Sequence, residues 1–358
     1  MKILILANND VGLYKFRKEL IEELINRGNA VYISLPDGDY VRFFEKIGCT
    51  FINTPVDRRG INPKIDIGLF QNYRKMMKEV NPDLVITYTI KPNIYGGIAS
   101  RLAKKQYAVN ITGLGTAFES AGIVRAVVVN LYKFALKKAK TVFFENKDNR
   151  KEFLSFRCCK AEKTVVLNGA GVNTEAYGYQ PYPNNGKVKF LFVGRVMKEK
   201  GIEELFEAMK RLVADGCNCF LDVVGPFEED YKQKLDQYEK LGWLKYHGYQ
   251  KDVVPFIVAC DCFVLPSYHE GMANTNLECA SSGRPIITSN IPGCKEAVVD
   301  GSGMLCEPRS VDSLYAAMRT MAAKPREERE QMGKVARRHM EDIFDKKQVI
   351  KETIKHLF

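Results

Sequence analysis

Short apolar runs alternate along the chain with longer segments in which apolar residues recur at helical spacing. Residues 2–7 and 30–34 are two such runs, and residues 14–26 between them have the period of an amphipathic helix, with Gly28 just past its end. A strand, a helix and a second strand in this order predict parallel pairing, because the crossover is long enough to hold a helix. The pattern therefore predicts a layered α/β fold.

The same alternation runs to residue 167 and begins again at residue 189. The stretch 179–186 between them is rich in Pro, Asn and Gly, as linkers are. A chain of 358 residues is also too long for one comfortable core. We therefore expect two Rossmann-like, doubly wound parallel-sheet domains, over 1–180 and 181–340, and a last helix in 341–358 that packs back on the first. Because such sheets bind ligands outside the carboxyl ends of their strands, we expect the domains to face a central cleft.

Two carboxylates lie around one predicted helix start. Residues 262–281 predict a buried strand, a turn and a helix, which Asn274 or Thr275 caps. Backbone N–H groups at a helix start suit a phosphate. Glu270 and Glu278 suit sugar diols, because carboxylates accept hydrogen bonds from vicinal hydroxyl groups. The alternative is that Glu278 is a solvated first-turn glutamate favoured by the helix dipole.

A second strand end carries the positive charge that a diphosphate needs. Gly194 and Arg195 follow the apolar run 189–193, and Lys200 precedes a helix predicted over 203–213. An arginine can contact two phosphate oxygens at once, and a lysine adds a point charge. Alone, an Arg and a Lys here indicate only solvated side chains. Beside the two glutamates they indicate a site for a nucleoside-diphosphate sugar.

These residues together resemble a known family, the retaining glycosyltransferases of the GT-B superfamily, in its large fourth family. The motifs that carry the resemblance are F-V-G-R-x4-K-G over 192–201, P-S-x2-E-G over 266–271, an E-x7-E spacing over 270–278 and G-R-P-I-I-T over 283–288. The resemblance implies the GT-B fold and metal-independent transfer of a sugar with retained anomeric configuration. It covers most of the chain, and the combination is specific although each motif alone is weak.

The resemblance also implies roles for single residues. Arg195 and Lys200 neutralise the leaving diphosphate in place of a metal, Glu278 binds the ribose and Glu270 the hydroxyl groups of the donor sugar, so that Glu270, Arg195 and Lys200 are the candidate catalytic residues. A covalent role for Glu270 is the less expected version. The donor nucleotide is expected to bind to Gly194, Arg195, Lys200, Tyr249, Lys251, Gly271, Met272, Ala273, Asn274 and Glu278.

The first half is similar, more narrowly, to bacterial members that extend polyprenyl-diphosphate-linked sugars, through V-G-L-Y-K-F-R over 11–17, T-I-K-P-N-I-Y-G over 89–96 and G-L-G over 113–115. The expected acceptor-binding residues are Gly12, Lys15, Arg17, Arg58, Arg59, Lys91, Thr112 and Gly113. For Gly12, a plain tight turn is the alternative. Related enzymes often place a histidine near the acceptor, but this chain has none before His247. Another residue fills that role, or none does.

The positive charge of the chain lies in its first half. Residues 1–180 hold 28 Lys and Arg against 17 Asp and Glu, whereas the remainder is neutral, so this half accounts for the whole net charge of +11. An acidic partner is therefore expected there: a lipid diphosphate or the anionic surface of the inner membrane. Nucleic acid is disfavoured because no RNA-binding motif, helix-turn-helix or basic arm occurs. A dinucleotide dehydrogenase is disfavoured too, since the first strand-to-helix loop lacks G-x-G-x-x-G.

Neither a metal nor a cofactor is expected. The ten cysteines include no Cys-x2-Cys pair and the four histidines do not cluster, so we interpret the cysteines as reduced core thiols. Asp37-Gly38-Asp39 matches a metal-binding D-x-D signature, but its place between a strand and a helix favours a turn. The N-terminal apolar run is too short for a signal peptide, and no run is long enough to span a membrane. We expect a cytoplasmic protein, peripheral on the inner face of the membrane.

The function that we predict is transfer of a hexose or N-acetylhexosamine from a UDP-sugar to a lipid-diphosphate-linked saccharide, in the biosynthesis of a bacterial capsule, O-antigen or other surface glycan. Two alternatives stay open. A sugar-nucleotide epimerase shares the architecture but needs more acid/base residues than this chain offers. A non-catalytic subunit that only docks on membranes has no need of the glutamates together with Arg195 and Lys200. The sequence does not identify the sugars or the linkage.

Overall fold

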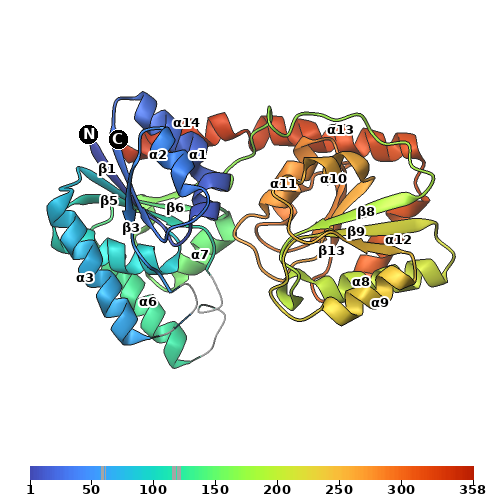
Figure 1. Ribbon diagram of the computed structural model, residues 1–358, viewed down its shortest axis with the longest axis horizontal. Coiled ribbons are helices and arrows are strands. Elements are labelled where there is room, and N and C mark those ends of the chain that lie inside the picture. Colours follow the sequence, from blue (N-terminus) through green and yellow to red (C-terminus); the bar gives the residue numbers. More distant parts are fainter. Residues whose placement is uncertain (58–59, 61, 115–117, 119–121) are drawn as a thin grey trace. The chain divides into compact units, whose positions relative to one another are not determined.

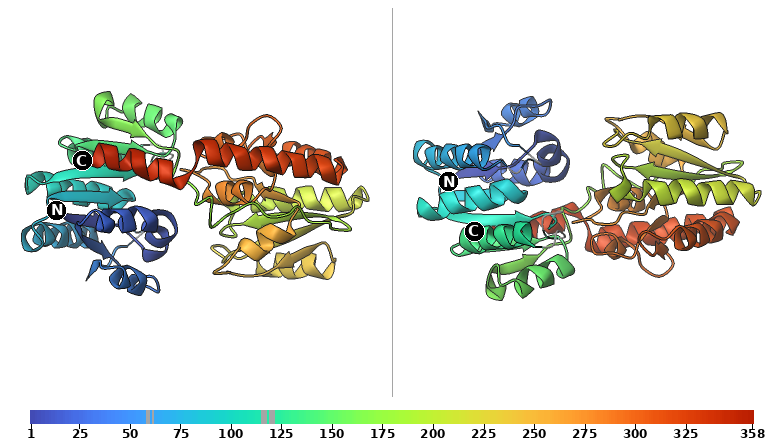
Figure 2. Two further views of the ribbon diagram at one scale, coloured as in Figure 1. Left: turned by 90° about the horizontal axis from the view of Figure 1, so that it is seen from above. Right: turned by 90° about the horizontal axis from the view of Figure 1, so that it is seen from below.

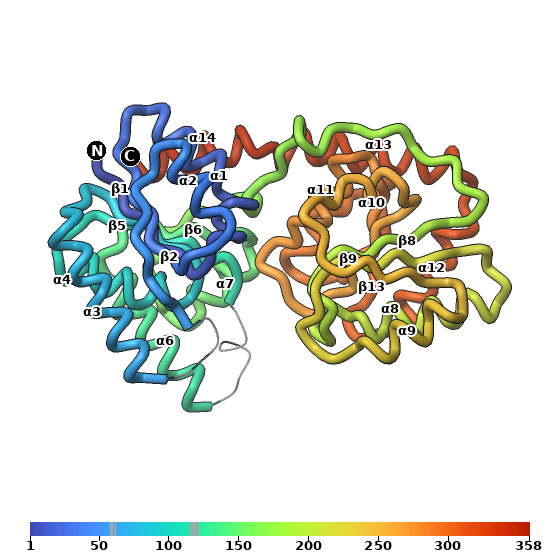
Figure 3. The backbone as a smooth tube through the Cα atoms, in the orientation of Figure 1, coloured from blue at the N-terminus to red at the C-terminus, as the bar shows by residue number. Residues whose placement is uncertain are grey.

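The computed structural model describes residues 1–57, 60, 62–114, 118 and 122–358. The chain divides into two compact units. The first comprises Met1–Ala170 and Val349–Phe358, and the second comprises Gly171–Gln348. Residues 171–180, expected in the first domain, thus belong to the second unit. Figure 1 labels the elements, and Figure 3 traces the order of the chain through each unit.

The first unit is built on a seven-stranded sheet in the order β3-β2-β1-β4-β5-β6-β7. Its strands are β1 (Lys2–Leu6), β2 (Ala30–Leu35), β3 (Thr50–Asn53), β4 (Leu84–Tyr88), β5 (Gln106–Ile111), β6 (Thr141–Phe144) and β7 (Thr164–Val166). Every neighbouring pair is parallel, with Ile3 of β1 opposite Val31 on one side and Leu84 on the other. Because β1 and β4 are neighbours but not consecutive, the strand order reverses between them.

Helices cover both faces of this sheet (Figure 2). They are α1 (Asp10–Asn26), α2 (Val41–Lys46), α3 (Pro63–Glu79), the π-helical turn η1 (Pro92–Gly96), α4 (Gly97–Leu102), α6 (Ile123–Leu136), α7 (Lys147–Ser155) and the short turn η2 (Ala161–Lys163). One core lies under α1 and α2, and the other under α3, α4, α6 and α7. Both cores receive apolar side chains from β1, in which every residue after Lys2 is buried.

The C-terminal helix α14 (Lys346–Leu357) completes the first unit. Val349, Ile354 and Leu357 are buried in the same core as α1. The Thr141 hydroxyl donates to the carbonyl of His356 at 2.9 Å, and Lys140 Nζ donates to the carbonyl of Leu357 at 2.9 Å. The last residues of the chain are therefore part of the packing of the first sheet.

The second unit has a six-stranded parallel sheet in the order β10-β9-β8-β11-β12-β13. Its strands are β8 (Val188–Val193), β9 (Cys219–Val224), β10 (Leu244–Tyr246), β11 (Cys262–Leu265), β12 (Ile286–Ser289) and β13 (Gly303–Cys306). Its helices are η3 (Lys198–Lys200), α8 (Ile202–Ala214), α9 (Lys232–Lys240), α10 (Val254–Ala259), α11 (Asn274–Ser281), η4 (Lys295–Ala297), α12 (Val311–Ala323) and α13 (Arg326–Ile343). The order reverses between β8 and β11. Figure 1 shows α8, α9 and α12 on one face, and α10, α11 and α13 on the other.

The prediction of two Rossmann-like units with parallel sheets is confirmed. The predicted start of the first helix is wrong: α1 begins at Asp10 because the side chain of Asn9 accepts a hydrogen bond from Gly12 N at 2.6 Å. This cap supplies a partner for an N–H group that would otherwise lack one, so four further residues join the helix.

Candidate functional site

The candidate donor site lies where the strand order of the second sheet reverses. Ligands of open parallel sheets bind outside the carboxyl ends of the strands at such a point. The loops after β8 and β11 meet there: Tyr268 N donates to Glu199 O at 2.9 Å. Most of the predicted donor residues lie on these two loops and on the start of α11.

Lys200 and Glu270 form the centre of this site. Lys200 Nζ donates to Glu270 Oε1 at 2.5 Å, and the Ser267 hydroxyl donates to the same oxygen at 2.8 Å. Both charged side chains are largely buried. A buried ion pair at a loop edge has lost much of its hydration, so a ligand that offers each partner a matching group competes for it more easily than water does.

Gly201 explains how the loop after β8 comes so close to the loop after β11. It has a left-handed backbone, with φ of +69°, between η3 and α8. A Cβ atom here would lie 2.1 Å from the carbonyl oxygen of Pro266. Only glycine has both the required conformation and the required size. The glycine after Lys200 is thus what permits Lys200 to reach Glu270.

Arg195 leaves the same strand end but has a different partner. It follows Gly194, its Nη1 atom lies 3.6 Å from Glu228 Oε2, and 42% of its side chain is exposed. Gly194 donates its N–H to Val224 O at 3.0 Å, and its carbonyl lies against Gly225, where a Cβ would come within 1.9 Å. Two closely packed backbone segments therefore hold Arg195 at the carboxyl end of β8.

The start of α11 corrects the predicted cap. The helix begins at Asn274 with Ala273 in the capping position, and no side chain caps it. The Asn274 amide instead donates back to Met272 O at 3.2 Å, and Ala273 N donates to Gly293 O at 2.7 Å. The loop before the helix, which includes Gly271, is thus fixed by backbone contacts, and the first turn keeps the partial positive charge of a helix start.

Glu278 lies one turn into α11 and has Tyr177 as a neighbour. Burial, followed by the charge of Glu278, raises the pKa of the Tyr177 hydroxyl above its usual range. The Tyr177 backbone is fixed in turn, because its carbonyl accepts from Ser281 Oγ at 2.7 Å. The structure therefore joins Lys200 to Glu270, while Arg195 and Glu278 each contact another residue.

Tyr249 and Lys251 follow β10 at the outer edge of the sheet. Both side chains are exposed. The loop that carries them is fixed to the next strand end, because Gly225 N donates to Gly248 O at 2.8 Å. Gly225 also lies against the carbonyl of Gly194 and so connects this loop to the loop of Arg195.

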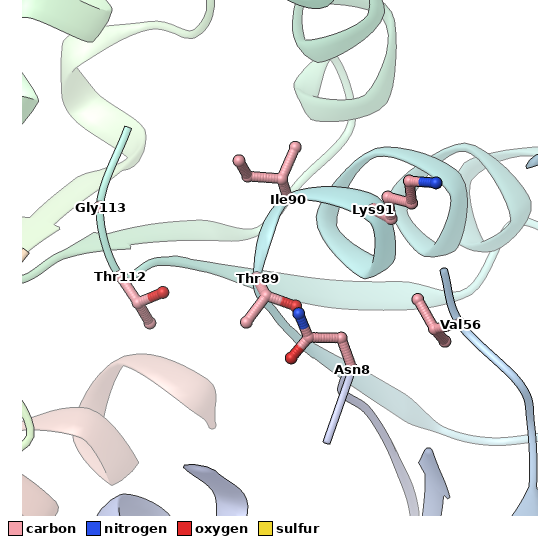
Figure 4. A pocket seen from close by; sticks show the side chains of 7 residues that line it. All are labelled: Asn8, Val56, Thr89, Ile90, Lys91, Thr112 and Gly113. Atoms are coloured by element: carbon pink, nitrogen blue, oxygen red, sulfur yellow. The ribbon is translucent and has the colours of Figure 1, made fainter. Parts of the chain in front are cut away.

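The first unit has a cavity of about 240 Å³ at the reversal of its own strand order. Residues that follow β1, β3, β4 and β5 line it: Asn8, Val56, Thr89, Ile90, Lys91, Thr112 and Gly113. Figure 4 shows Asn8 and Thr89 pointing toward one another, with the Thr112 hydroxyl beside them. Lys91, Thr112 and Gly113 were predicted to bind the acceptor, and the structure brings these three together.

Lys91 is fixed by a carboxylate on α3. Its Nζ donates to Asp66 Oδ1 at 2.7 Å, and Tyr95 OH donates to Asp66 Oδ2 at 3.0 Å. Both members of the ion pair are mostly buried. The cation therefore has a defined position beside the cavity.

The remaining predicted acceptor residues lie elsewhere. Arg17 is buried, donates to Glu145 Oε1 at 2.6 Å and lies over the ring of Tyr88, so its charge is matched within the unit. Gly12 and Lys15 lie in the first turns of α1. Arg58 and Arg59 lie outside the described residues, as do Gly115 and Thr116 of the glycine-rich loop.

Several site residues were missed by the sequence analysis: Asn8, Thr89, Asp66, Ser267 and Glu228. Thr89 had a recognisable place, directly after a buried strand, but its positive φ of +71° is a property of the fold alone. A left-handed threonine is rare and marks local strain, which is common at binding sites. Asp66 and Glu228 are partners of predicted cations from distant parts of the chain, so no local pattern identifies them.

Across the residues that the structure describes, no group of three or more His, Cys, Asp or Glu side chains is arranged to hold a metal ion. Among the described helices, none combines the length and the apolar character needed to cross a bilayer.

Two family descriptions match the chain, one for each half. Residues 179–339 match the family described as glycosyl transferases group 1. Residues 2–146 match the family described as glycosyl transferase 4-like. Together they cover every strand of the two sheets except β7, and the first includes both loops of the candidate donor site.

Curated relatives are transferases of bacterial glycans. The chain is 28% identical over 316 residues, 83% of each chain, to the N,N'-diacetylbacillosaminyl-diphospho-undecaprenol alpha-1,3-N-acetylgalactosaminyltransferase of Campylobacter jejuni. It is 28% identical over 270 residues, 68% of this chain and 67% of the other, to the UDP-Gal:alpha-D-GlcNAc-diphosphoundecaprenol alpha-1,3-galactosyltransferase of Escherichia coli.

Solved structures share the fold. Anabaena HepE, solved in complex with UDP and glucose, has a TM-score of 0.82 at 18% identity, over 100% of this chain and 99% of that one. A glycosyltransferase of Rickettsia africae has a TM-score of 0.80 at 16% identity, over 99% and 97%. The family matches, the relatives and the two parallel sheets agree: the chain is a glycosyltransferase of the GT-B fold, whose second half matches the group 1 family and whose first half matches the 4-like family.

Proposed function

We propose that this glycosyltransferase moves a hexose or N-acetylhexosamine from a UDP-sugar to a lipid-diphosphate-linked saccharide, in the synthesis of a bacterial surface glycan. The names of the two relatives support this proposal, since both act on sugars linked to undecaprenyl diphosphate and one takes UDP-galactose. The observation that carries the donor side is the buried Lys200–Glu270 pair at the strand-order reversal of the second sheet.

Each charged group of the donor site has a role that its chemistry suits. Lys200 and Arg195 neutralise the diphosphate, and the start of α11 adds the N–H groups of an uncapped helix. Glu270 accepts hydrogen bonds from the hydroxyl groups of the donor sugar, and Glu278 accepts them from the ribose. Tyr249 and Lys251 border the base.

The transfer proceeds with retention and without a metal. The acceptor hydroxyl attacks the anomeric carbon on the face from which the diphosphate leaves, the bond from that carbon to the phosphate oxygen breaks, and that phosphate oxygen takes the hydroxyl proton. Lys200 and Arg195 stabilise the charge that develops on the diphosphate, and this kind of stabilisation is the main one available to a site with no separate nucleophile and base. Glu270 stays hydrogen-bonded to the sugar.

The acceptor binds at the cavity of the first unit. Its size suits a sugar ring, and Thr112 and Gly113 offer a hydroxyl and a close backbone approach. Lys91, fixed by Asp66, supplies positive charge for the diphosphate of the lipid carrier. Gly12, Lys15, Arg17, Arg58 and Arg59 stay predictions as acceptor-binding residues, although Glu145 already matches the charge of Arg17. A lipid-linked acceptor implies that the enzyme works as a peripheral protein at the cytoplasmic face of the membrane.

The test is incubation of the purified protein with a panel of UDP- and GDP-sugars, with and without a polyprenyl-diphosphate-linked saccharide. We expect UDP release that depends on the acceptor, together with a product one sugar longer whose new linkage has the anomeric configuration of the donor. Addition of EDTA should leave the rate unchanged. Transfer with inversion, or loss of transfer in EDTA, contradicts the mechanism.

The same incubation separates the two alternatives. An epimerase converts the sugar nucleotide into its epimer without an acceptor, and the family matches disfavour it. A docking subunit without chemistry leaves every sugar nucleotide intact. Either result in place of transfer overturns the proposed function.

A further inference from the structure

Helix α6 of the first unit exposes apolar side chains on the side that faces away from the core. Its buried residues are Val129, Tyr132, Ala135 and Leu136. Ile123, Val127 and Phe134 lie on the opposite side and are 82%, 50% and 46% exposed. Their spacing, i, i+4 and i+11, places them in one stripe along the helix. The helix is thus apolar on two sides, one buried in the core and the other largely exposed.

The exposed apolar surface extends beyond the stripe of Ile123, Val127 and Phe134. Val124, on the same helix, and Leu102, at the end of α4, are also strongly exposed. Arg101 joins the two helices, because its guanidinium lies 4.1 Å from the centre of the Phe134 ring and donates to Phe134 O at 2.8 Å. Figure 1 and Figure 2 show α6 in the layer that also holds α3 and α4. Single exposed apolar residues need no explanation, but a contiguous apolar surface marks an interaction site.

The segment of the chain that carries the stripe is almost entirely positive in charge. Residues 84–144 contain nine Lys and Arg against a single acidic residue. Lys133 on α6 and Lys137 and Lys138 directly after it are exposed, and Lys104 and Lys105 follow α4. An apolar face flanked by lysines is typical of a helix that lies in the interface of an anionic bilayer, where lysine stems follow the apolar surface and their ammonium groups meet lipid phosphates.

We propose that the outward face of α6, with the lysines beside it, docks the enzyme on an anionic lipid bilayer, the helix lying in the plane of the interface. The proposal rests on the proposed function, since a lipid-linked acceptor has to be met at a membrane. The position of α6 fits this role, because α6 packs against η1, which directly follows the cavity residue Lys91. The docked face and the acceptor cavity thus belong to neighbouring elements of one unit.

A second copy of the chain is the competing occupant. Symmetric dimers bring the same patch of each copy together, so the lysines of one α6 would face the lysines of the other. That repulsion disfavours a dimer through this face and favours a partner of negative charge. The two occupants also predict different results.

The experiment is co-sedimentation of the full chain with vesicles of phosphatidylcholine, with or without phosphatidylglycerol. We expect binding to the anionic vesicles that weakens with added salt, and little binding to the neutral ones. The triple variant Ile123→Ser, Val127→Ser and Phe134→Ser should bind at least about tenfold more weakly, and so should Lys133→Gln, Lys137→Gln and Lys138→Gln combined. The control is Leu241→Ser, because Leu241 is equally exposed but lies in the second unit.

Two activity assays separate this proposal from the proposed function. The triple apolar variant should lose transfer to an acceptor embedded in anionic vesicles and keep transfer to a short-chain acceptor dispersed in detergent. If the wild type transfers to neither acceptor but sedimentation behaves as expected, the proposed function fails and the docking surface stands.

Three outcomes overturn the docking surface. They are unchanged vesicle binding in the triple variant, equal binding of the wild type to neutral and anionic vesicles, and conversion of a dimer to a monomer by the triple variant in sedimentation velocity. The last result would assign the stripe to self-association.

Discussion

At the scale of single residues, the proposed donor site depends on one short contact, between Lys200 and Glu270, whose loops are distant in sequence. Lys200 has a convenient neighbour for comparison in Lys198, which lies on the same turn but extends into solvent, 3.8 Å from Glu203. The two lysines carry the same charge and differ in where the fold directs them.

Lys200→Ala should lower kcat by about 10²- to 10³-fold, because the developing charge on the leaving diphosphate loses a preorganised partner. Lys198→Ala should leave kcat within about twofold of the wild type, because an exposed, long ion pair contributes little. The measurement is the initial rate of UDP release at saturating donor, with circular dichroism to show that both variants fold. Equal rates for the two variants would remove Lys200 from the mechanism.

The acceptor side allows a similar comparison on α3. Asp66→Asn keeps the shape of the side chain but removes the charge that fixes Lys91, so the acceptor KM should rise by about tenfold while the donor KM stays constant. Glu79→Gln, an exposed carboxylate at the end of the same helix, is the matched control. An unchanged acceptor KM in Asp66→Asn would show that Lys91 does not meet the acceptor.

At the scale of elements, the sequence predicted the strands and most helix ends, since apolar runs and turn residues mark them locally. It predicted the place of Lys200 and Glu270 because glycines and loops surround both. It could not predict that Arg17 would be buried against Glu145, because that pair joins residues 128 positions apart. Nor could it predict the start of α11, since Ala273 is fixed by the carbonyl of Gly293, beyond the next strand.

Glycine conformation gives an element-scale prediction. Gly201 and Gly216 both have positive φ, of +69° and +77°, but a Cβ at Gly216 meets no atom within 4 Å. Gly216→Ala should therefore cost only the conformational strain, on the order of 1 kcal/mol. Gly201→Ala adds the overlap with Pro266 and should cost roughly 2 kcal/mol more, with loss of transfer.

The measurement is the free energy of unfolding in urea for both variants, beside the rate of UDP release. Equal costs would mean that the loops after β8 and β11 separate easily, and that their contact does not fix the Lys200–Glu270 pair.

At the scale of the whole molecule, the chain passes between its two units twice, near residues 170 and 348. The first unit is therefore built from both ends of the sequence. Leu357, the penultimate residue, is 1% exposed in a core that also contains β1 and α1. A truncation that looks harmless from the sequence would remove part of that core.

Leu357→Ala should lower the stability of the first unit by about 2–5 kcal/mol, as expected for a leucine deleted from a packed core. Lys355→Ala, two residues earlier and on the exposed side of α14, should change the stability by less than about 0.5 kcal/mol. Scanning calorimetry should show the loss as a lower transition temperature for one unit only. An equal shift of the transition temperature of both units would mean that the units do not unfold separately.

This split of the first unit also affects the order in which the protein forms on the ribosome. Domains generally fold as the chain emerges, yet Val349, Ile354 and Leu357 leave the exit tunnel after every residue of the second sheet. The second unit can be complete while the first unit, begun earlier, still lacks the helix α14. During that interval the apolar side chains that Val349, Ile354 and Leu357 cover in the finished core are exposed to water.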